Sequence, residues 1–225
     1  MIRFITSTRI HTAEEFMDTT LLGRSFQRLA QFSAMEIKIG LNAKDGLASV
    51  FNPEIEQAAP EDILVFIHDD VWIDDWLIEF RLKEALASFD VIGIAGNRVR
   101  EPMQRGWYGT MGALGEEFKA LGEPRYAVGR LNDIPTYSNN ITPVEVKLLD
   151  GVFIAVKAAT LHASGVRFDP QFLYHHYDLD LCRQCEQAGL KMGIWPIALT
   201  HAQTIGDLGQ AWFDSGTAYL NKWSD

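Results

Sequence analysis

The first hundred residues alternate short apolar runs with longer stretches in which apolar residues recur every three or four positions. The short runs predict strands at 2–6, 36–40, 63–67 and 91–95, and the longer stretches predict helices at 13–31, 47–58 and 75–87. The last helix carries Trp76, Phe80, Leu82 and Leu86 at such spacings, so that one face can lie on a sheet. Parallel strands joined by crossover helices give this alternation. We therefore predict an α/β fold, a three-layer sandwich with a mostly parallel central sheet.

The regular pattern stops between residues 97 and 143, where Gly, Pro, Arg and aromatic residues are frequent. So long a stretch without periodicity is usually a functional loop region or a flexible segment, and its aromatic residues argue against plain disorder. Two strand-like runs around Asp150 and Gly151 follow, then a short helix, a helix through about residue 189 and a strand-like run at 191–199. With 225 residues and 47% hydrophobic content, the chain can bury one core, so we expect a single domain over 1–225.

The formal charge of -10 makes nucleic acid an improbable partner, because proteins that bind phosphate backbones gather Lys and Arg on one face. An anionic small ligand stays compatible with this charge if a metal or a few arginines neutralise it. No apolar run approaches the roughly 20 residues of a transmembrane helix, and acidic residues interrupt the N-terminal stretch before a signal-peptide core could form. We expect a cytoplasmic protein. Cys182 and Cys185 are expected to pack in the core.

His68, Asp69 and Asp70 directly follow the run at 63–67. In open α/β sheets, ligands bind beyond the carboxyl ends of the strands. Adjacent side chains on an extended chain point in opposite directions, so a metal or polar ligand would meet His68 and Asp70 together while Asp69 faces away. The alternative is that Asp69 or Asp70 caps a helix that starts near residue 74.

A second polar cluster comprises His175, His176, Tyr177, Asp178 and Asp180, at the start of an amphipathic helix. One of the two aspartates is expected to cap that helix, where negative charge is favourable. A carboxylate close to other acids and aromatic rings can have its pKa raised into the range of a general base.

His201 also follows an apolar run. Such a histidine can be purely structural, or it can converge on the same rim as Asp70 and supply an imidazole to a cation such as Mn²⁺.

Two long segments, IKIGLNAKDGLASVFNPEIEQAAPEDILVFIHDDVWIDDW and LLDGVFIAVKAATLHASGVRFDPQFLYHHYDLDLCRQCEQAGLKMGIWPIALTHA, resemble in order and spacing the family-2 glycosyltransferases of glycosyltransferase-A fold. The resemblance extends from residue 2 to about residue 201. It implies a nucleotide-binding half at 1–96, a variable acceptor-side segment at 97–143, a catalytic half at 144–201 and a C-terminal tail at 202–225. The tail could be a lid, an acceptor surface or a contact in a homo-dimer.

In that family a strand-end Asp-x-Asp binds a divalent cation, Mn²⁺ or Mg²⁺, that grips the diphosphate of a nucleotide sugar. The matching residues here are His68, Asp69 and Asp70, so His replaces the first Asp and Asp70 is the main candidate ligand. His201 matches a metal-binding His of many relatives. The family's Glu-Asp-x-Asp segment matches residues 177–180, with Tyr177 in place of Glu. The resemblance makes Asp178 the catalytic base and Asp180 its helix-capping neighbour.

The resemblance also implies positions for the two substrates. Residues that would hold the nucleotide, beside Asp69 and Asp70, are Thr6, Arg9, Asn42 and Asn52. On the acceptor side, Asp150 and Gly151 would lie beside the acceptor, with a tight turn as the alternative. Trp107 and Tyr108 could stack on a sugar ring, and Arg98, Arg100 and Arg105 could hold phosphate; the alternative is a solvated loop with a local aromatic core.

The expected function is a glycosyltransferase that moves a sugar from a nucleoside-diphosphate sugar to an acceptor hydroxyl, with a metal and with inversion. Nothing in the residues separates UDP from GDP or dTDP donors. A glycoside hydrolase also uses two carboxylates. A nucleotide- or glycan-binding domain without catalysis is a further alternative, because His68 and Tyr177 depart from the family pattern.

Overall fold

The computed structural model describes residues 1–32, 34–107, 143–202 and 209–224. It also gives the backbone of four short strands between residues 109 and 138: β7 (Gly109–Thr110), β8 (Lys119–Ala120), β9 (Arg125–Gly129) and β10 (Tyr137–Ser138). Among the described residues, no helix combines the length and the apolar character that crossing a bilayer requires.

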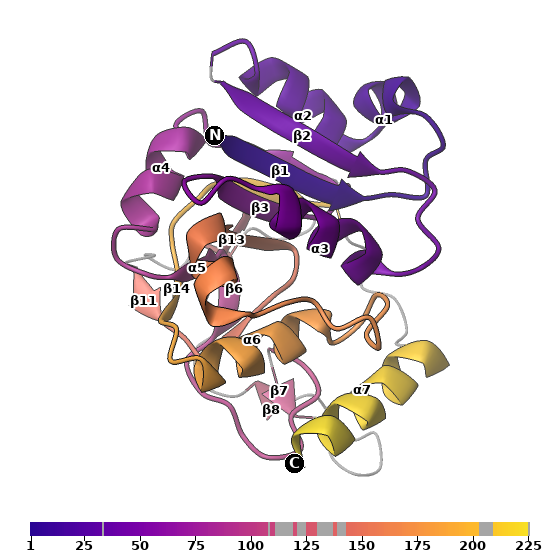
Figure 1. Ribbon diagram of the computed structural model, residues 1–225, viewed down its shortest axis with the longest axis vertical. Coiled ribbons are helices and arrows are strands. Elements are labelled where there is room, and N and C mark those ends of the chain that lie inside the picture. Colours follow the sequence, from indigo (N-terminus) through magenta and orange to yellow (C-terminus); the bar gives the residue numbers. More distant parts are fainter. Residues whose placement is uncertain are drawn as a thin grey trace.

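The centre of the molecule is a seven-stranded sheet in the order β11-β14-β5-β13-β3-β1-β2 (Figure 1). The bounds are β1 (Ile2–Ser7), β2 (Met35–Gly40), β3 (Ile63–Ile67), β5 (Val91–Gly93), β11 (Val144–Glu145), β13 (Phe153–Lys157) and β14 (Met192–Ile194). All of these strands run in one direction except β13, which is antiparallel to β3 and β5, and β11, which is antiparallel to β14. The predicted mostly parallel sheet is confirmed.

Helices cover both faces of this sheet, because successive strand side chains point to opposite sides. They are α1 (Ala13–Thr19), α2 (Leu21–Leu29), α3 (Leu47–Gln57), α4 (Ile78–Ala85), α5 (Ala158–Ser164) and α6 (Tyr177–Gln187), whereas α7 (Gln210–Trp223) packs against α6. On β3, Phe66 packs into a core with α3, α5 and α6, and its neighbour Val65 packs into a second core with α1, α2 and α4. The predicted three-layer α/β architecture is confirmed (Figure 1).

A smaller sheet in the order β12-β6-β9-β15-β4 adjoins the carboxyl end of β3. Its other strands are β4 (Val71–Ile73), β6 (Ala95–Asn97), β12 (Leu148–Leu149) and β15 (Leu199–His201). The strand predicted at 91–95 is divided between the two sheets, since β5 ends at Gly93 and β6 begins at Ala95. Because β15 pairs antiparallel with β4, His201 lies opposite Val71 and therefore next to Asp70.

The helix predicted at 13–31 is in fact two helices. Thr20 between them has extended backbone angles, and its hydroxyl accepts a hydrogen bond from Gly23 N at 2.9 Å, which starts α2. The two helices approach closely here, since a Cβ at Gly23 would lie 2.3 Å from the Phe16 carbonyl oxygen. The spacing of apolar residues in the sequence does not reveal this contact between α1 and α2.

The helix predicted at 75–87 begins later and buries another face. Asp75 accepts a hydrogen bond from Leu77 N at 2.8 Å, and α4 follows from Ile78. Its buried residues are Ile78, Leu82 and Ala85, whereas Trp76 and Phe80 are 53% and 59% exposed. The prediction that Trp76 and Phe80 face the sheet is therefore wrong. The Arg28 guanidinium lies over the Trp76 ring, 4.1 Å from its centroid, on the surface.

Candidate functional site

Two clefts meet at the carboxyl end of β3. The larger, of about 580 Å³, is lined by the ends of β1 and β3, by the start of α3 and by residues 174–175. The smaller, of about 210 Å³, is lined by the first turn of α6, by residues 105–107 and by Trp212 of α7. His68, Tyr174 and His175 line both clefts. The clefts therefore share a wall, and a molecule in one would lie beside a molecule in the other.

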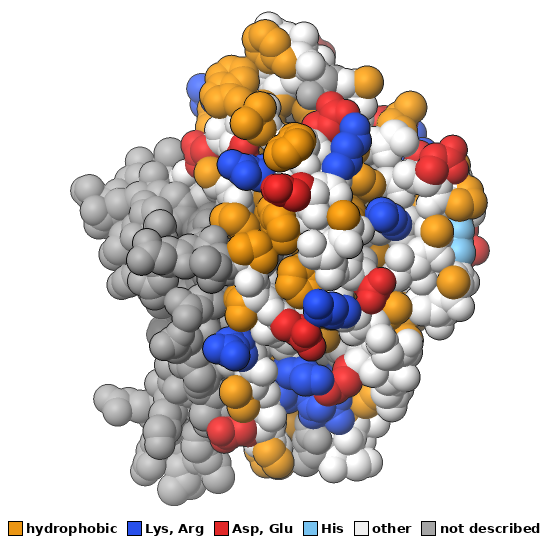
Figure 2. Space-filling view, turned by 90° about the vertical axis from the view of Figure 1, so that its left-hand side faces the viewer, with side chains coloured by type: hydrophobic (Ala, Val, Ile, Leu, Met, Phe, Trp, Pro, Cys, Tyr) orange, Lys and Arg blue, Asp and Glu red, His pale blue; other side chains and the backbone are white. Residues whose placement is uncertain are grey.

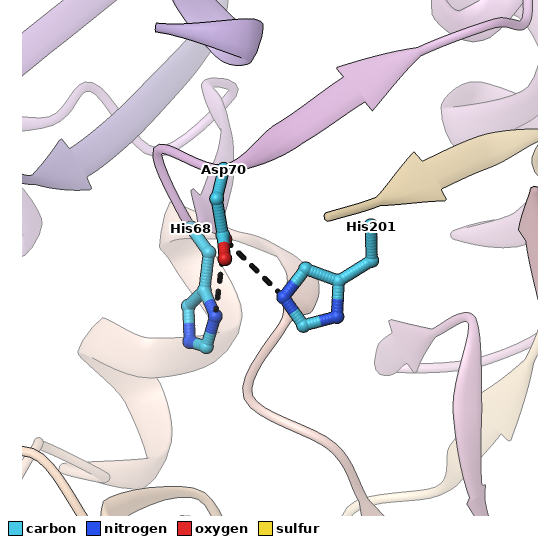
Figure 3. Close-up of side chains that lie close together, drawn as sticks. All are labelled: His68, Asp70 and His201. Atoms are coloured by element: carbon cyan, nitrogen blue, oxygen red, sulfur yellow. Dashed lines mark ion pairs between the residues drawn. The ribbon is translucent and has the colours of Figure 1, made fainter. Parts of the chain in front are cut away.

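His68, Asp70 and His201 form a compact cluster at this junction. Their ligand atoms lie within 4.8 Å of one another. Asp70 Oδ1 lies 3.2 Å from His201 Nε2 and 3.9 Å from His68 Nδ1. Figure 3 shows the carboxylate directed toward both rings, with Asp70 delivered by the turn after β3 and His201 by β15. The pairing of β15 with β4 thus joins residues that are far apart in the sequence.

The three groups of this cluster influence one another's protonation. Burial, and next the nearby His201, lower the pKa of His68. Burial raises the pKa of Asp70, but His201 and His68 outweigh it and hold that pKa below its ordinary value. Burial lowers the pKa of His201, but the Asp70 carboxylate outweighs it and raises the pKa. Asp70 is therefore ionised at neutral pH, as a cation ligand must be.

The donor atoms of the cluster fit a divalent cation. Asp70 Oδ1 and His201 Nε2 are both buried, and apart from the ion pair between them neither has a hydrogen-bond partner of regular geometry among the described residues. Both atoms are therefore available to a cation once His201 is neutral, as a histidine ligand must be. Two imidazole nitrogens and a carboxylate oxygen are ligands that divalent first-row transition metals accept, Mn²⁺ chiefly through the carboxylate and the later metals also through imidazole.

Asp69 and Asp70 lie in the turn after β3 and not on an extended chain, and Asp69 has partners of its own. Its Oδ2 accepts a hydrogen bond from the Thr8 hydroxyl at 2.6 Å, and the same hydroxyl oxygen accepts one from Ile10 N at 3.2 Å. The alternative that Asp69 or Asp70 caps a helix near residue 74 is wrong, because β4 follows the turn directly. Asp69 instead ties the end of β3 to the end of β1.

Asp178 lies in the first turn of α6 and lines the smaller cleft. Its Oδ2 accepts a hydrogen bond from Gly151 N at 3.0 Å, and its Oδ1 accepts one from Leu179 N at 2.9 Å. Burial, followed by the charge of Asp150, raises the pKa of Asp178 to about 7. A carboxyl group with such a pKa can accept and release a proton near neutral pH.

Gly151 allows this arrangement, because a Cβ there would lie 2.1 Å from the Tyr177 hydroxyl oxygen. Only a residue without a side chain lets Tyr177 pack this closely. Asp150 next to it accepts a hydrogen bond from Val152 N at 3.1 Å, which is a turn contact, and also lines the smaller cleft.

Asp180 does not cap α6, as was predicted, but binds side chains of α6 and α7. It is fully buried, its Oδ2 accepts a hydrogen bond from Gln184 Nε2, and its Oδ1 accepts one from the Trp223 indole at 2.9 Å. The Lys222 ammonium lies 2.6 Å from the same Oδ1. The residue at the cap position of α6 is His176, in the left-handed region with φ 62° and without a side-chain cap bond. Asp180 therefore holds α7 in place.

The residues expected to hold a nucleotide lie at different depths. Arg9 lines the larger cleft. Thr6 is fully buried within β1, whereas Asn42 is exposed and outside the lining. The Asn52 side chain donates to Phe168 O at 2.8 Å and accepts from Phe168 N at 3.0 Å, so it ties α3 to the segment before α6.

On the acceptor side, Trp107 and Arg105 line the smaller cleft. Arg100 is paired with Glu186 at 2.5 Å, Arg98 is exposed, and Tyr108 lies outside the described residues. Sequence reasoning missed Thr8, Tyr174 and Trp212. Thr8 was detectable in principle, since it follows the strand end by one residue, but the place of Trp212 depends on how α7 returns to the cleft.

Both cysteines of the chain are free and buried, as expected. Burial raises the pKa of both thiols, that of Cys185 to about 12. They lie on the buried side of α6, pack in the core and stay protonated, so they are poor nucleophiles.

No protein-family model matches the sequence, and no curated protein matches it either. Solved structures do match. GalNAc-T7 with UDP, GalNAc and Mn²⁺ aligns with a TM-score of 0.52 and 10% identity, over 100% of this chain and 50% of that one. S. aureus TarS 1–349 aligns with a TM-score of 0.49 and 13% identity, over 86% and 57%. A197 from STIV aligns with a TM-score of 0.49 and 13% identity, over 93% and 98%.

The chain thus spans about half the length of the GalNAc-T7 structure that it matches. The likeness, together with the mostly parallel sheet between two helical layers, shows that the chain has the glycosyltransferase-A type of fold. The expected resemblance in fold is confirmed.

Proposed function

We propose that this protein is a glycosyltransferase that moves a sugar from a nucleoside-diphosphate sugar to an acceptor hydroxyl, with a divalent cation and with inversion. The observation that carries the proposal is the position of Asp178. Its carboxyl, with a pKa of about 7, lines a cleft that shares His68 with the cleft containing the candidate cation cluster.

The larger cleft is the proposed donor site. Arg9 and the Thr8–Asp69 pair line it, and they offer a cation, a hydroxyl and a carboxylate to a nucleotide. His68, Asp70 and His201 would hold the divalent cation, which supplies Lewis-acid stabilisation of the negative charge that develops on the leaving diphosphate. A solved structure of the same fold contains UDP and Mn²⁺, which supports this assignment.

The smaller cleft is the proposed acceptor site. Trp107, Trp212 and Tyr174 line it, and aromatic rings of this kind pack on sugar rings. Asp178 would take the proton of the acceptor hydroxyl while that oxygen bonds to the anomeric carbon and the bond from this carbon to the diphosphate breaks. Gly151 N holds Oδ2 in place during the transfer. Attack on the side opposite the leaving group gives inversion.

The test is calorimetric titration with UDP, GDP, dTDP and CMP, each with Mn²⁺ and again with excess EDTA. We expect one nucleoside diphosphate to bind only with the cation, and its sugar conjugates to be transferred or slowly hydrolysed. Absence of binding for every nucleotide would contradict the proposal.

Cytoplasmic location and a homo-dimer stay predictions.

The Asp178→Asn variant separates an enzyme from a non-catalytic binding domain of the same fold. We expect it to bind the nucleotide as tightly as the wild type and to lose transfer, because the amide cannot accept the proton. Equal transfer by both proteins would remove Asp178 from the base role.

A further inference from the structure

His68 and Tyr177 form a hydrogen-bonded pair at the wall between the two clefts. His68 Nε2 lies 2.8 Å from the Tyr177 hydroxyl oxygen, and its other nitrogen, Nδ1, lies on the side of Asp70. Tyr177 is 5% exposed, and its hydroxyl end packs against Gly151, where a Cβ would lie 2.1 Å from it. The tyrosine is therefore held firmly, and it fixes the rotation of the His68 ring.

This contact determines which nitrogen of His68 faces the cluster. A neutral imidazole that binds a cation through Nδ1 must carry its proton on Nε2. That N–H can donate to the Tyr177 oxygen, as metal-binding histidines usually donate their second ring N–H to a nearby acceptor. Tyr177 thereby orients His68, the third side chain that could bind the cation, without touching the cation itself.

The resulting ligand set is unusual for a hard cation. It offers two imidazole nitrogens and a single carboxylate oxygen. Mg²⁺ and Ca²⁺ prefer oxygen ligands. Imidazole suits first-row transition metals, whose affinities for such sites increase along the series from Mn²⁺. With Asp70 alone contributing negative charge among the three, a hard dication gains less electrostatic stabilisation here than between two carboxylates.

We propose that His68, held by Tyr177, makes this site selective for first-row transition-metal cations over Mg²⁺ and Ca²⁺. The inference rests on the proposed function in taking the cluster as the cation site, but it concerns cation binding and is tested without a nucleotide. Tyr177 is a positioning residue, and His68 is the ligand that it orients.

The experiment titrates the metal-free full chain with Mn²⁺ and Co²⁺ in the calorimeter, then with Mg²⁺ and Ca²⁺. Absorption of bound Co²⁺ reports nitrogen ligation independently of activity. We expect Mn²⁺ and Co²⁺ to bind and excess Mg²⁺ to displace neither. Equal affinities for Mg²⁺ and Mn²⁺, or no binding of either transition metal, would overturn the inference.

Two variants test the mechanism. Tyr177→Phe keeps the ring against Gly151 and removes the hydroxyl, and it should weaken Co²⁺ binding about 10- to 100-fold, the usual cost of removing an outer support. His68→Asp should let Mg²⁺ compete with Mn²⁺. Thr217→Val is the control, because it also removes one hydroxyl, which donates to Phe213 O at 3.0 Å on the exposed side of α7 and lines neither cleft. An unchanged Co²⁺ affinity and spectrum in Tyr177→Phe would refute the positioning role.

Failure of this inference can be told apart from failure of the proposed function. Sugar transfer that runs equally well with Mg²⁺ would overturn the selectivity and leave the transferase. Selective Co²⁺ binding without any nucleotide binding would overturn the transferase and support the selectivity.

Discussion

At the scale of single residues, Asp178 predicts how transfer depends on pH. Its carboxyl has a pKa of about 7 because of burial and the charge of Asp150. A base works only when deprotonated, so the transfer rate should rise as pH increases through about 7 and level off above it. Asp178→Asn should lower the rate by about 10²- to 10⁴-fold and abolish this dependence. Initial rates between pH 5.5 and 8.5 test this, and a rate that stays constant over this range would contradict it.

The same residue predicts how stability depends on pH. The pKa of Asp178 is raised from 3.8 to about 7 on folding, so the folded state binds the proton more tightly than the unfolded state between these values. Stability contributed by this proton is present at low pH and is lost as pH rises through about 7. Asp178→Asn should therefore gain stability over the wild type at pH 8 and not at pH 4. Denaturant unfolding at both pH values measures the difference, and an equal change at both would refute the linkage.

At the scale of secondary-structure elements, Gly23 predicts the cost of separating α1 from α2. A Cβ there would lie 2.3 Å from the Phe16 carbonyl oxygen, so Gly23→Ala must push the two helices apart. We expect a loss of roughly 1–3 kcal/mol in the free energy of unfolding. Gly209→Ala is the control, since a Cβ there meets nothing within 4 Å. Similar unfolding midpoints for the two variants would contradict the close contact.

The attachment of α7 to α6 gives a second prediction at this scale. Lys222 Nζ lies 2.6 Å from Asp180 Oδ1, and Asp180 is fully buried. Lys222→Met leaves that carboxylate without its cation and should destabilise the protein by roughly 3 kcal/mol, as broken buried pairs do. Lys83→Met removes the exposed i,i+4 pair with Glu79 and should cost at most about 0.5 kcal/mol. Urea unfolding of both variants tests this difference. Equal losses in the free energy of unfolding would contradict it.

The order of helices and strands was predictable where the pattern is local. The run at 63–67 is buried on both faces and became β3 with those bounds. Predictions failed where contacts with other segments decide the structure. Thr20 interrupts one helix where α2 folds back on α1, and α4 buries Ile78 and Leu82 while Trp76 lies on the surface against Arg28. Periodicity shows that a face is apolar but does not show which neighbour covers it.

Within the candidate site, position relative to strand ends was predictable and partners were not. His68, Asp70 and His201 each follow an apolar run, and the strand order brings them together. Asp178 and Asp180 look alike in the sequence, yet one faces a cleft and the other binds α7. Only the path of the chain after residue 209 distinguishes them.

At the scale of the whole molecule, the formal net charge is -10. Figure 2 shows acidic and basic side chains interspersed on the face that carries α4, with hydrophobic side chains gathered toward its upper end. The exposed hydrophobic residues include Phe32, Trp76, Leu77 and Phe80. This face therefore offers no continuous basic surface to a phosphate backbone.

Ligand binding should stabilise the whole molecule. A ligand present at about one hundred times its Kd adds about 2.7 kcal/mol to the free energy of unfolding. For a chain of this size such a gain raises Tm by roughly 5–10 °C. We expect Mn²⁺ together with the bound nucleotide to raise Tm by this amount, and EDTA to reverse the rise. His201→Ala should lose the Mn²⁺-dependent part of the shift, and Lys83→Met should keep it. Differential scanning fluorimetry is the measurement, and a shift in His201→Ala equal to that of Lys83→Met would exclude His201 as a ligand.

The seating of α7 on Asp180 also gives the protein an optical signal of its own. The Trp223 indole donates to a buried carboxylate and lies under the Arg183 guanidinium, 4.8 Å from the ring centroid. Indole fluorescence depends on nearby charges. The emission maximum and intensity of Trp223 should therefore change if α7 separates from α6. The difference spectrum between wild type and Trp223→Phe isolates that light from the other tryptophans. Because Trp212 of α7 lines the smaller cleft, this signal would report on that wall of the cleft without an attached dye.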